Sequence, residues 1–420
     1  MAICKGVESD HSEPNWQSEV FHLVICLTNV LEIVHCAKTF YCRIMITEQN
    51  KTNLSRRLRV LFVISDLSGG GAERVVSTYL HHLDRSRFEP GLCLWRDIRA
   101  YPVPSDVPVW VMKKNKPWQT PRTVYRMARL IKKWQPDIIF SHLRFVNLLT
   151  GIACCFSDSR RAWLPCVHSN PGNKKAISTS PLLTSLMKRR AATIVTVSKG
   201  IAGCLQTRFG IPESKLSVLY NPIDFDPIEK AAPANGHKPG DTFQIVTMGR
   251  LMEQKDHRTL LYAFAEVRKR YNATLIILGE GPLRSELESL SRDLKLESVI
   301  DFKGFVSNPF GIIKASDIFV LSSQYEGFGN ALVEAMGCGV VCVSTRCPYG
   351  PEEIIEDGKT GLLVPVANAG ALSQAILTLL EDPQYRQRLA ESGKESVISR
   401  FSASVRTRVL EALLFETMRG

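Results

Sequence analysis

The stretch LRVLFVISDLSGGGAERVVSTYLHHL, residues 58–83, is the clearest indication of the fold of this 420-residue chain. It opens with a short continuous apolar run, as in parallel strands that are buried on both faces. Three glycines follow and lead into an amphipathic helix. A buried strand, a glycine loop and a helix make up the first part of a strand–helix–strand unit, so we expect parallel α/β structure.

The alternation of buried strands and helices continues along the chain with one interruption. We expect strands in PDIIFSHL, AWLPCVHSN and ATIVTVS, and later in FQIVTMGR, ATLIILGEG, VIDFKGFV, DIFVLSS and VVCVST. Between the two groups, NPIDFDPIEKAAPANGHKPGD is rich in turn-forming residues and is typical of a linker. The sequence therefore predicts two Rossmann-like, doubly wound parallel-sheet domains that face each other across a cleft.

We divide the chain into an atypical extension (1–55), a first domain (56–225), a linker (226–240), a second domain (241–395) and a C-terminal helix (396–420) that packs back on the first domain. The extension has neither an uninterrupted spanning segment nor the pattern of a signal peptide. Two hypotheses remain open for it. Either Met45 is the natural start, or the extension is a peripheral membrane anchor.

Composition restricts the partners and the compartment. The formal net charge of +12 favours an anionic partner. The twelve cysteines are scattered without a CxxC pair, which indicates free thiols in a reducing compartment. A nucleic-acid binder would explain the charge, but the chain has no zinc spacing, RNP motif or recognisable helix-turn-helix.

Three strand-to-helix loops carry residues suited to a phosphorylated ligand. Glycines 69–71 allow backbone N–H groups to approach an anion at a helix N-terminus, although a plain tight turn would look the same. Arg250 and Lys255 suit a diphosphate. In EGFGNALVE, the glycine loop lets Glu326 and Glu334 point at one ligand, unless Glu334 only serves the helix start.

EGFGNALVE has the E-x7-E form of retaining glycosyltransferases with the GT-B fold, and the chain resembles glycosyltransferase family 4 from about residue 58 to 400. SGGGAER, VHSN, GRLMEQKD and GPEEIIEDGKTGLLV contribute to this resemblance. It implies that the first domain binds the acceptor and the second binds a nucleotide sugar. It implies that Glu334 binds the ribose, and that Glu326 contacts the transferred sugar together with the backbone of Phe328, Gly329, Asn330 and Ala331. It also implies that Arg250, Lys255, Gly70 and Gly71 bind the phosphates. His168 would lie at the sugar's primary hydroxyl, and His142 is a weaker candidate for the same role.

The resemblance also implies a catalytic set of Glu326, His168, Arg250 and Lys255, with retention of configuration. No metal or cofactor is expected, and we interpret the DxD-like Asp224 and Asp226 as structural. STRCPYGPEEII, residues 344–355, resembles members that use UDP-linked hexosamines, and a GDP-sugar is the alternative. A two-carboxylate glycosidase and a non-catalytic relative of the transferases also stay open as interpretations of the chain.

The expected acceptor is a polysaccharide or a glycan on a lipid carrier, at the inner face of the cytoplasmic membrane. Residues 111–133 contain eight basic residues and no acid, and residues 173–190 contain five more, including Lys174 and Lys175. Trp118 and Trp134 flank the first group. This pattern favours reversible docking on anionic lipid, with a solvated basic face as the alternative.

Overall fold

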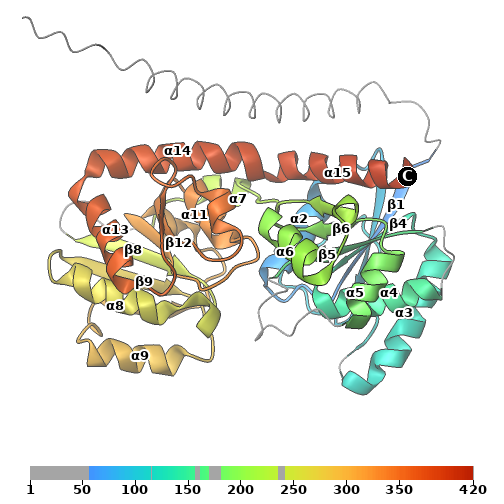
Figure 1. Cartoon of the computed structure of the whole chain (residues 1–420), viewed down its shortest axis with the longest axis horizontal. Coiled ribbons are helices and arrows are strands. Elements are labelled where there is room, and N and C mark those ends of the chain that lie inside the picture. The colour runs from blue at the N-terminus through green and yellow to red at the C-terminus, as the bar shows by residue number, and fades with distance from the viewer. Residues whose placement is uncertain (1–55, 115, 157–160, 170–180, 235–241, 420) are drawn as a thin grey trace, which may run out of the picture. The chain divides into compact units, whose positions relative to one another are not determined.

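The computed structural model describes residues 56–114, 116–156, 161–169, 181–234 and 242–419 (Figure 1). The expectations for residues 1–55, for Lys174 and Lys175, and for most of the second half of the linker lie outside this part of the chain. The two parallel α/β sheets predicted from the sequence are confirmed.

The first sheet has seven strands in the order β3-β2-β1-β4-β5-β6-β7, with every described pair parallel. The strands are β1 (Leu58–Ile64), β2 (Phe88–Leu94), β3 (Val109–Val111), β4 (Ile138–His142), β5 (Ala162–Val167), β6 (Ile194–Thr196) and β7 (Leu216–Val218). Its helices are α2 (Gly71–His82), α3 (Thr120–Trp134), α4 (Arg144–Cys155), α5 (Pro181–Arg190) and α6 (Lys199–Phe209).

The second sheet has six parallel strands in the order β10-β9-β8-β11-β12-β13. The strands are β8 (Phe243–Met248), β9 (Ala273–Leu278), β10 (Ile300–Gly304), β11 (Ile318–Leu321), β12 (Val341–Thr345) and β13 (Leu362–Val364). The helices after the first sheet are α7 (Asp226–Lys230), α8 (His257–Arg268), α9 (Arg284–Asp293), α10 (Phe310–Lys314), α11 (Asn330–Gly337), α12 (Pro351–Ile354), α13 (Ala369–Glu381), α14 (Pro383–Phe401) and α15 (Ala403–Arg419).

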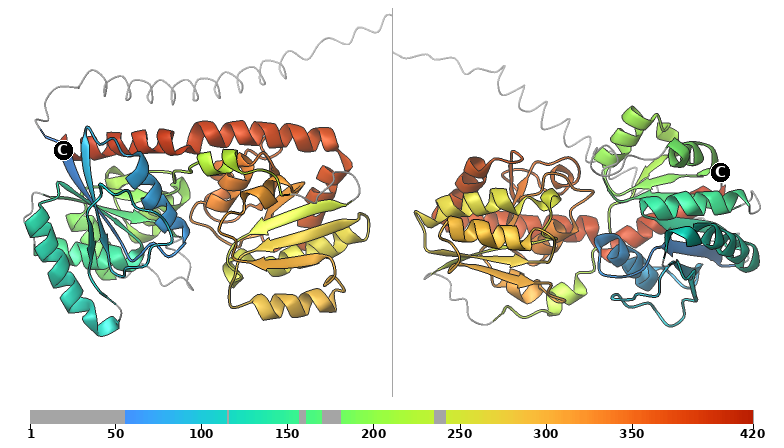
Figure 2. Two further views of the ribbon diagram at one scale, coloured as in Figure 1. Left: turned by 180° about the vertical axis from the view of Figure 1, so that it is seen from behind. Right: turned by 90° about the horizontal axis from the view of Figure 1, so that it is seen from below.

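Helices cover both faces of each sheet, as the turned views show (Figure 2). This layering explains why the strands are continuous apolar runs instead of alternating ones. In β1, for example, Val60, Phe62, Val63 and Ile64 are all completely buried. The core of each half therefore lies on both sides of its sheet.

Strand β2 was not predicted from the sequence, because FEPGLCL contains Pro90 and Gly91, which usually interrupt strands. Gly91 is needed because two tryptophans cover it. A Cβ there would lie 2.7 Å from Trp110 and 3.0 Å from Trp134. Trp134 therefore packs inside the domain, with its ring 5.1 Å from that of Trp110, and only Trp118 of the predicted pair is exposed, at 69%.

The chain passes from the first half to the second near Ile223 and returns near Phe401, and the two crossing segments lie side by side. The Ile223 N–H donates to the Phe401 carbonyl at 2.9 Å, and the Ala403 N–H donates to the Ile223 carbonyl at 2.8 Å. After this crossing α15 packs against α2 of the first half, where the Glu411 carboxylate accepts the Asp84 N–H at 2.9 Å. The helices α14 and α15 thus run along both halves (Figure 1).

Among the described cysteines, all of which are free, only Cys155 is exposed. Burial raises the pKa of the thiols of Cys93, Cys154, Cys338 and Cys347 to about 12. Within the described part of the chain, no helix is both long and apolar enough to cross a bilayer.

Candidate active site

Both sheets reverse their strand order next to their first strand, between β1 and β4 and between β8 and β11. Ligands of open parallel sheets bind beyond the carboxyl ends of the strands at such points. The structure has a cavity of about 1120 Å³ there, lined by loops of both halves. Apart from the weaker candidate His142, all the predicted site residues line it: Gly70, Gly71, His168, Arg250, Lys255, Glu326, Phe328, Gly329, Asn330, Ala331 and Glu334.

The glycine loop after β1 leads directly into α2. Gly69 has φ +116°, a conformation that favours glycine, and Gly70 caps the helix with an extended backbone. A Cβ on Gly70 would collide with the Glu73 carboxylate, which folds back over the loop. Desolvation raises the pKa of Glu73. The glycine loop and the N-terminus of α2 therefore lie at the cavity, with the Glu73 carboxylate beside them.

Lys255 and Glu326 form an ion pair of 2.5 Å between Nζ and Oε1, with both side chains largely buried. The loops that carry them are held together by the Ser322 hydroxyl, which donates to the Lys255 carbonyl at 2.8 Å, and by the Gln254 side-chain amide, which donates to the Tyr325 carbonyl at 2.9 Å. The lysine is thus held at the wall of the cavity. Arg250 lies exposed at the same cavity wall.

Glu334 lies in α11 and is 3% exposed. Arg74 of α2 reaches across from the other half, and its Nη1 lies 2.5 Å from Glu334 Oε1. Tyr101 holds the arginine in place, since its hydroxyl accepts a bond from Arg74 Nε at 3.3 Å and donates to the Gly69 carbonyl at 3.1 Å. Both predicted carboxylates are therefore paired with cations, which leaves neither as a free nucleophile.

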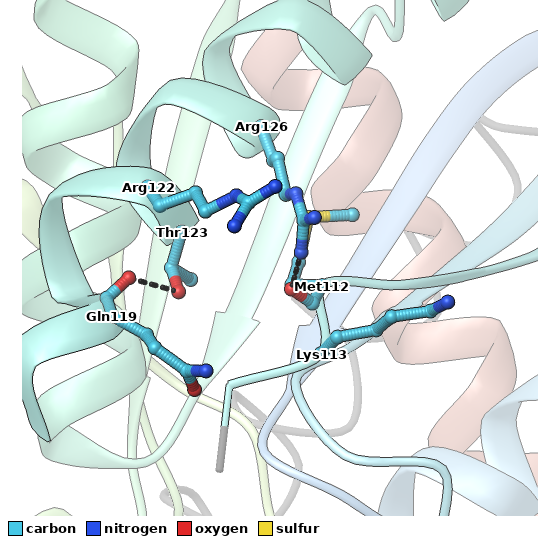
Figure 3. Close-up of a pocket in the computed structure, with 6 residues that line it drawn as sticks. All are labelled: Met112, Lys113, Gln119, Arg122, Thr123 and Arg126. Atoms are coloured by element: carbon cyan, nitrogen blue, oxygen red, sulfur yellow. Dashed lines mark hydrogen bonds between the residues drawn. The ribbon is translucent and has the colours of Figure 1, made fainter. Parts of the chain in front are cut away.

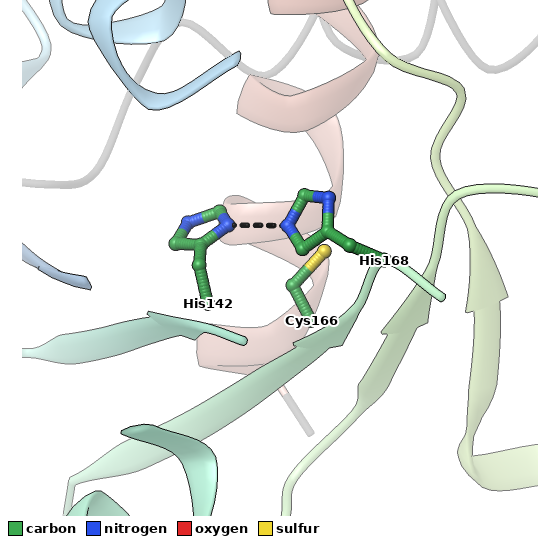
Figure 4. A group of neighbouring side chains, drawn as sticks. All are labelled: His142, Cys166 and His168. Atoms are coloured by element: carbon green, nitrogen blue, oxygen red, sulfur yellow. Dashed lines mark hydrogen bonds between the residues drawn. The ribbon is translucent and has the colours of Figure 1, made fainter. Parts of the chain in front are cut away.

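His168 and the weaker candidate His142 lie together at the carboxyl ends of β5 and β4 (Figure 4). His142 Nδ1 and His168 Nε2 are 2.9 Å apart. Desolvation lowers the pKa of His168 to about 4 and that of His142 well below its ordinary value, so both imidazoles are neutral at pH 7. With Cys166 they form a group whose possible ligand atoms lie within 4.8 Å of one another.

Asp224 and Asp226 do not line the cavity. The Asp224 carboxylate accepts the Asp226 N–H at 3.1 Å, at the start of the short helix α7. These contacts are those of a helix start inside the predicted linker, which agrees with the structural interpretation of the pair.

Two residues that join the halves at the site were not predicted from the sequence. Arg74 was visible in SGGGAER, but nothing local indicates its partner Glu334, 260 positions away. Glu353 of α12 accepts the backbone N–H groups of Lys199 and Gly200 at 2.8 and 2.9 Å, which caps the N-terminus of α6 from the opposite half. Its position in GPEE at a helix start was the only local signal.

The cavity combines the carboxylates of Glu326 and Glu334 with their two paired cations, the exposed Arg250 and a helix N-terminus, and Glu73 and Glu280 also line it. Preorganised positive groups of this kind stabilise charge that develops on a leaving phosphate, and this is commonly the largest contribution to catalysis. The arrangement suits the departure of a nucleoside diphosphate from a sugar.

Two family matches cover most of the described chain. Residues 69–227 match the family described as Glycosyltransferase Family 4, and residues 229–396 match Glycosyl transferases group 1. They meet at the linker between the two sheets.

Curated relatives are also glycosyltransferases. The chain is 32% identical, over 80% of its length and 93% of the relative's, to the N-acetylgalactosamine-N,N'-diacetylbacillosaminyl-diphospho-undecaprenol 4-alpha-N-acetylgalactosaminyltransferase of Campylobacter jejuni. It is 25% identical to the lipopolysaccharide 1,6-galactosyltransferase of Salmonella typhimurium, over 73% of this chain and 85% of that one.

Solved structures share the fold. The Anabaena protein HepE, crystallised with UDP-glucose, superposes with a TM-score of 0.73 at 21% identity, over 86% of this chain and all of that one. The lipopolysaccharide outer core galactosyltransferase WaaB superposes with a TM-score of 0.66 at 21% identity, over 86% of this chain and 99% of that one. The chain therefore belongs to glycosyltransferase family 4 and is a hexosyltransferase with the GT-B fold.

Proposed function

We propose that this enzyme transfers a hexose or N-acetylhexosamine from a nucleotide sugar, preferably UDP-linked, to a glycan on a lipid carrier or a polysaccharide, with retention of configuration. The observation that carries the proposal is the common cavity, in which the glycine loop of one half faces Arg250, Lys255, Glu326 and Glu334 of the other. The name of the Campylobacter relative, which includes a diphospho-undecaprenol acceptor, supports the acceptor class.

In this mechanism Glu334 holds the ribose, and Arg250 and Lys255 receive the charge of the departing diphosphate. The acceptor hydroxyl attacks from the face that the leaving group vacates and gives its proton to the departing diphosphate oxygen, and this retains the anomeric configuration. Lys255 exchanges its contact with Glu326 for one with phosphate, and Glu326 becomes available to a sugar hydroxyl. The glycosidase interpretation is set aside because the family consists of transferases.

A donor screen by thermal unfolding tests the nucleotide. A ligand at a hundredfold excess over its Kd adds about 2.7 kcal/mol to the free energy of unfolding. We expect UDP to stabilise the full chain more than GDP or ADP at equal concentration, and Lys255→Ala to reduce that gain. A larger gain with GDP would select a GDP-sugar as the donor. Proton coupling constants of the product's anomeric centre then test retention.

We further propose that the basic face of the first half contacts anionic lipid. Here α3 and the preceding residues surround a hollow of about 220 Å³ lined by three cations, Lys113, Arg122 and Arg126 (Figure 3). No carboxylate among the described residues pairs with any of them, and Trp118 and Tyr125 are exposed beside them at 69% and 62%. Cations with exposed aromatic rings are typical of reversible interfacial binding.

Vesicle cosedimentation tests this contact. Among the exposed cations of this face, Arg122, Arg129 and Lys133 lie on helix α3. Each cation near an anionic surface contributes about 1 kcal/mol, so Arg122→Gln, Arg129→Gln and Lys133→Gln together should weaken binding to phosphatidylglycerol vesicles by about a hundredfold. The matched control removes the same charge from α14 and α15, at the exposed residues Arg388, Lys394 and Arg408. If both triple variants lost the same factor in vesicle affinity, binding would depend only on total charge, and the proposed docking face would be refuted.

A further inference from the structure

His142 is completely buried and contacts the cavity only through His168. We infer that His142 is a positioning residue that fixes His168 in the tautomer with its proton on Nδ1, so that His168 presents a hydrogen-bond donor to the sugar. The inference rests on the proposed function for the identity of the ligand, but the tautomer itself is a property of the unliganded enzyme.

The two rings meet because their strands are neighbours. In the register of β4 and β5, His142 pairs with Cys166, and His168 follows two residues later on the same side. The 2.9 Å separation of the two nitrogens is a hydrogen bond of the N–H···N type. Such a bond needs one protonated and one unprotonated nitrogen, and each neutral imidazole has a single N–H.

Two arrangements satisfy this requirement, and they differ at the far nitrogen of His142. This Nε2 atom is buried and has no hydrogen-bond partner among the described residues. The His142 ring lies between Phe62 and Phe140, with ring centroids at 6.2 and 4.3 Å, so its surroundings are largely apolar. A buried N–H without a partner costs more than an unused acceptor lone pair, as the rarity of orphaned N–H groups shows.

The favoured arrangement therefore has the proton on His142 Nδ1, which donates to His168 Nε2. Neutral His168 then carries its own proton on Nδ1. No described residue bonds to this Nδ1 atom, and His168 lines the cavity. His168 consequently offers a donor to a sugar oxygen and does not act as a base.

Cys166 allows a competing interpretation, because two imidazoles and one thiol are a ligand set that zinc accepts. A bound ion would need the lone pairs of both histidines directed at one point. In the structure the facing nitrogens are instead directed at each other.

NMR of the enzyme labelled with ¹⁵N-histidine tests the tautomer without reference to activity. We expect His168 to show a protonated Nδ1 and an unprotonated Nε2, and His142→Phe, which keeps a ring but removes the donor, to shift His168 toward the other tautomer. His142→Asn places an amide donor near the former Nδ1 position and should restore the wild-type signature. A protonated Nε2 on His168 in the wild type, or stoichiometric zinc in the purified enzyme, would overturn the inference.

Kinetics then test the consequence for transfer. Loss of a single orienting hydrogen bond reduces activity by roughly tenfold. We expect His142→Phe to lose this much in kcat while the Kd for UDP stays within about twofold, because His142 does not contact the diphosphate residues, and His142→Asn to recover most of it. An unchanged kcat in a His142→Phe enzyme with the altered NMR signature would show that the His168 tautomer does not matter to transfer. If no nucleotide sugar is turned over by the wild type, the proposed function fails while the NMR result stands.

Discussion

Gly327 lies in the loop that carries Glu326 and packs against the backbone of the His168 loop in the opposite half. A Cβ built on Gly327 would overlap the His168 carbonyl oxygen and lie only 2.9 Å from its carbonyl carbon. The obstacle is backbone, which cannot rotate aside as a flexible side chain could. Gly327→Ala should therefore hold the two loops apart.

The size of the effect follows from this overlap. Carbon–oxygen contacts are ordinarily about 3.3 Å or longer, so the two loops have to separate by about 1 Å or more. A displacement of about 1 Å at a reacting centre can cost roughly 100-fold in rate, which corresponds to about 2.7 kcal/mol of transition-state stabilisation. We expect Gly327→Ala to lose at least this factor in kcat/KM for transfer, measured with the nucleotide sugar that the thermal screen selects.

Gly203→Ala is the matched control. Gly203 lies in α6, and a Cβ there meets nothing within 4 Å. This variant should keep full activity and become slightly more stable, because alanine favours the helix over glycine. Wild-type activity in Gly327→Ala, with normal thermal unfolding, would refute the idea that close approach of these two loops is required for transfer.

Three further changes test the site and its supports. Glu334→Ala and Lys255→Ala should each abolish turnover with little change in circular dichroism, and full activity in either would show that the donor site is assigned wrongly. Glu353→Ala removes a carboxylate that accepts two backbone N–H groups from the opposite half. We expect it to lower the free energy of unfolding, measured by urea titration, by about 2 kcal/mol. A change of less than about 0.5 kcal/mol would contradict the role of Glu353 as a helix cap. Desolvation lowers the pKa of buried His257 to about 4, below its value of about 6.5 in the unfolded chain, so stability should fall as the pH drops from 6.5 toward 4. From pH 6.5 to 5 the contribution of His257 to this loss is about 1.6 kcal/mol, and His257→Asn should make the dependence of unfolding free energy on pH shallower. An unchanged slope would contradict a neutral buried His257.

The sequence predicted those residues of the site whose position follows from local structure. A glycine loop after an apolar strand lies at the carboxyl edge of a parallel sheet wherever such a sheet forms. Gly70, Gly71, Arg250 and Lys255 therefore fell into the cavity as expected. Strand β2 was missed because its glycine, Gly91, depends on contacts that are not local. The two tryptophans that cover Gly91 are distant in the sequence, so no local pattern indicates that a glycine fits this strand.

Contacts between the halves could not be predicted from the sequence. The pairing of Arg74 with Glu334, the cap that Glu353 provides and the fit of Gly327 against His168 each join segments more than 150 positions apart. The hydrogen bond between His142 and His168 likewise depends on strand register, because β4 and β5 must align for the rings to meet.

The two parallel α/β halves, the loops at their strand ends and the resemblance to a transferase family could be predicted from the sequence, because apolar runs, glycines and spacing are local properties of the chain. Which charges face each other became known only from the three-dimensional structure. Each predicted carboxylate meets a cation, Glu326 with Lys255 and Glu334 with Arg74. The energy of such a pair depends on distance and burial. Glu326 meets Lys255 because β8 and β11 are neighbours in one sheet, whereas Glu334 meets Arg74 only when the two halves pack together.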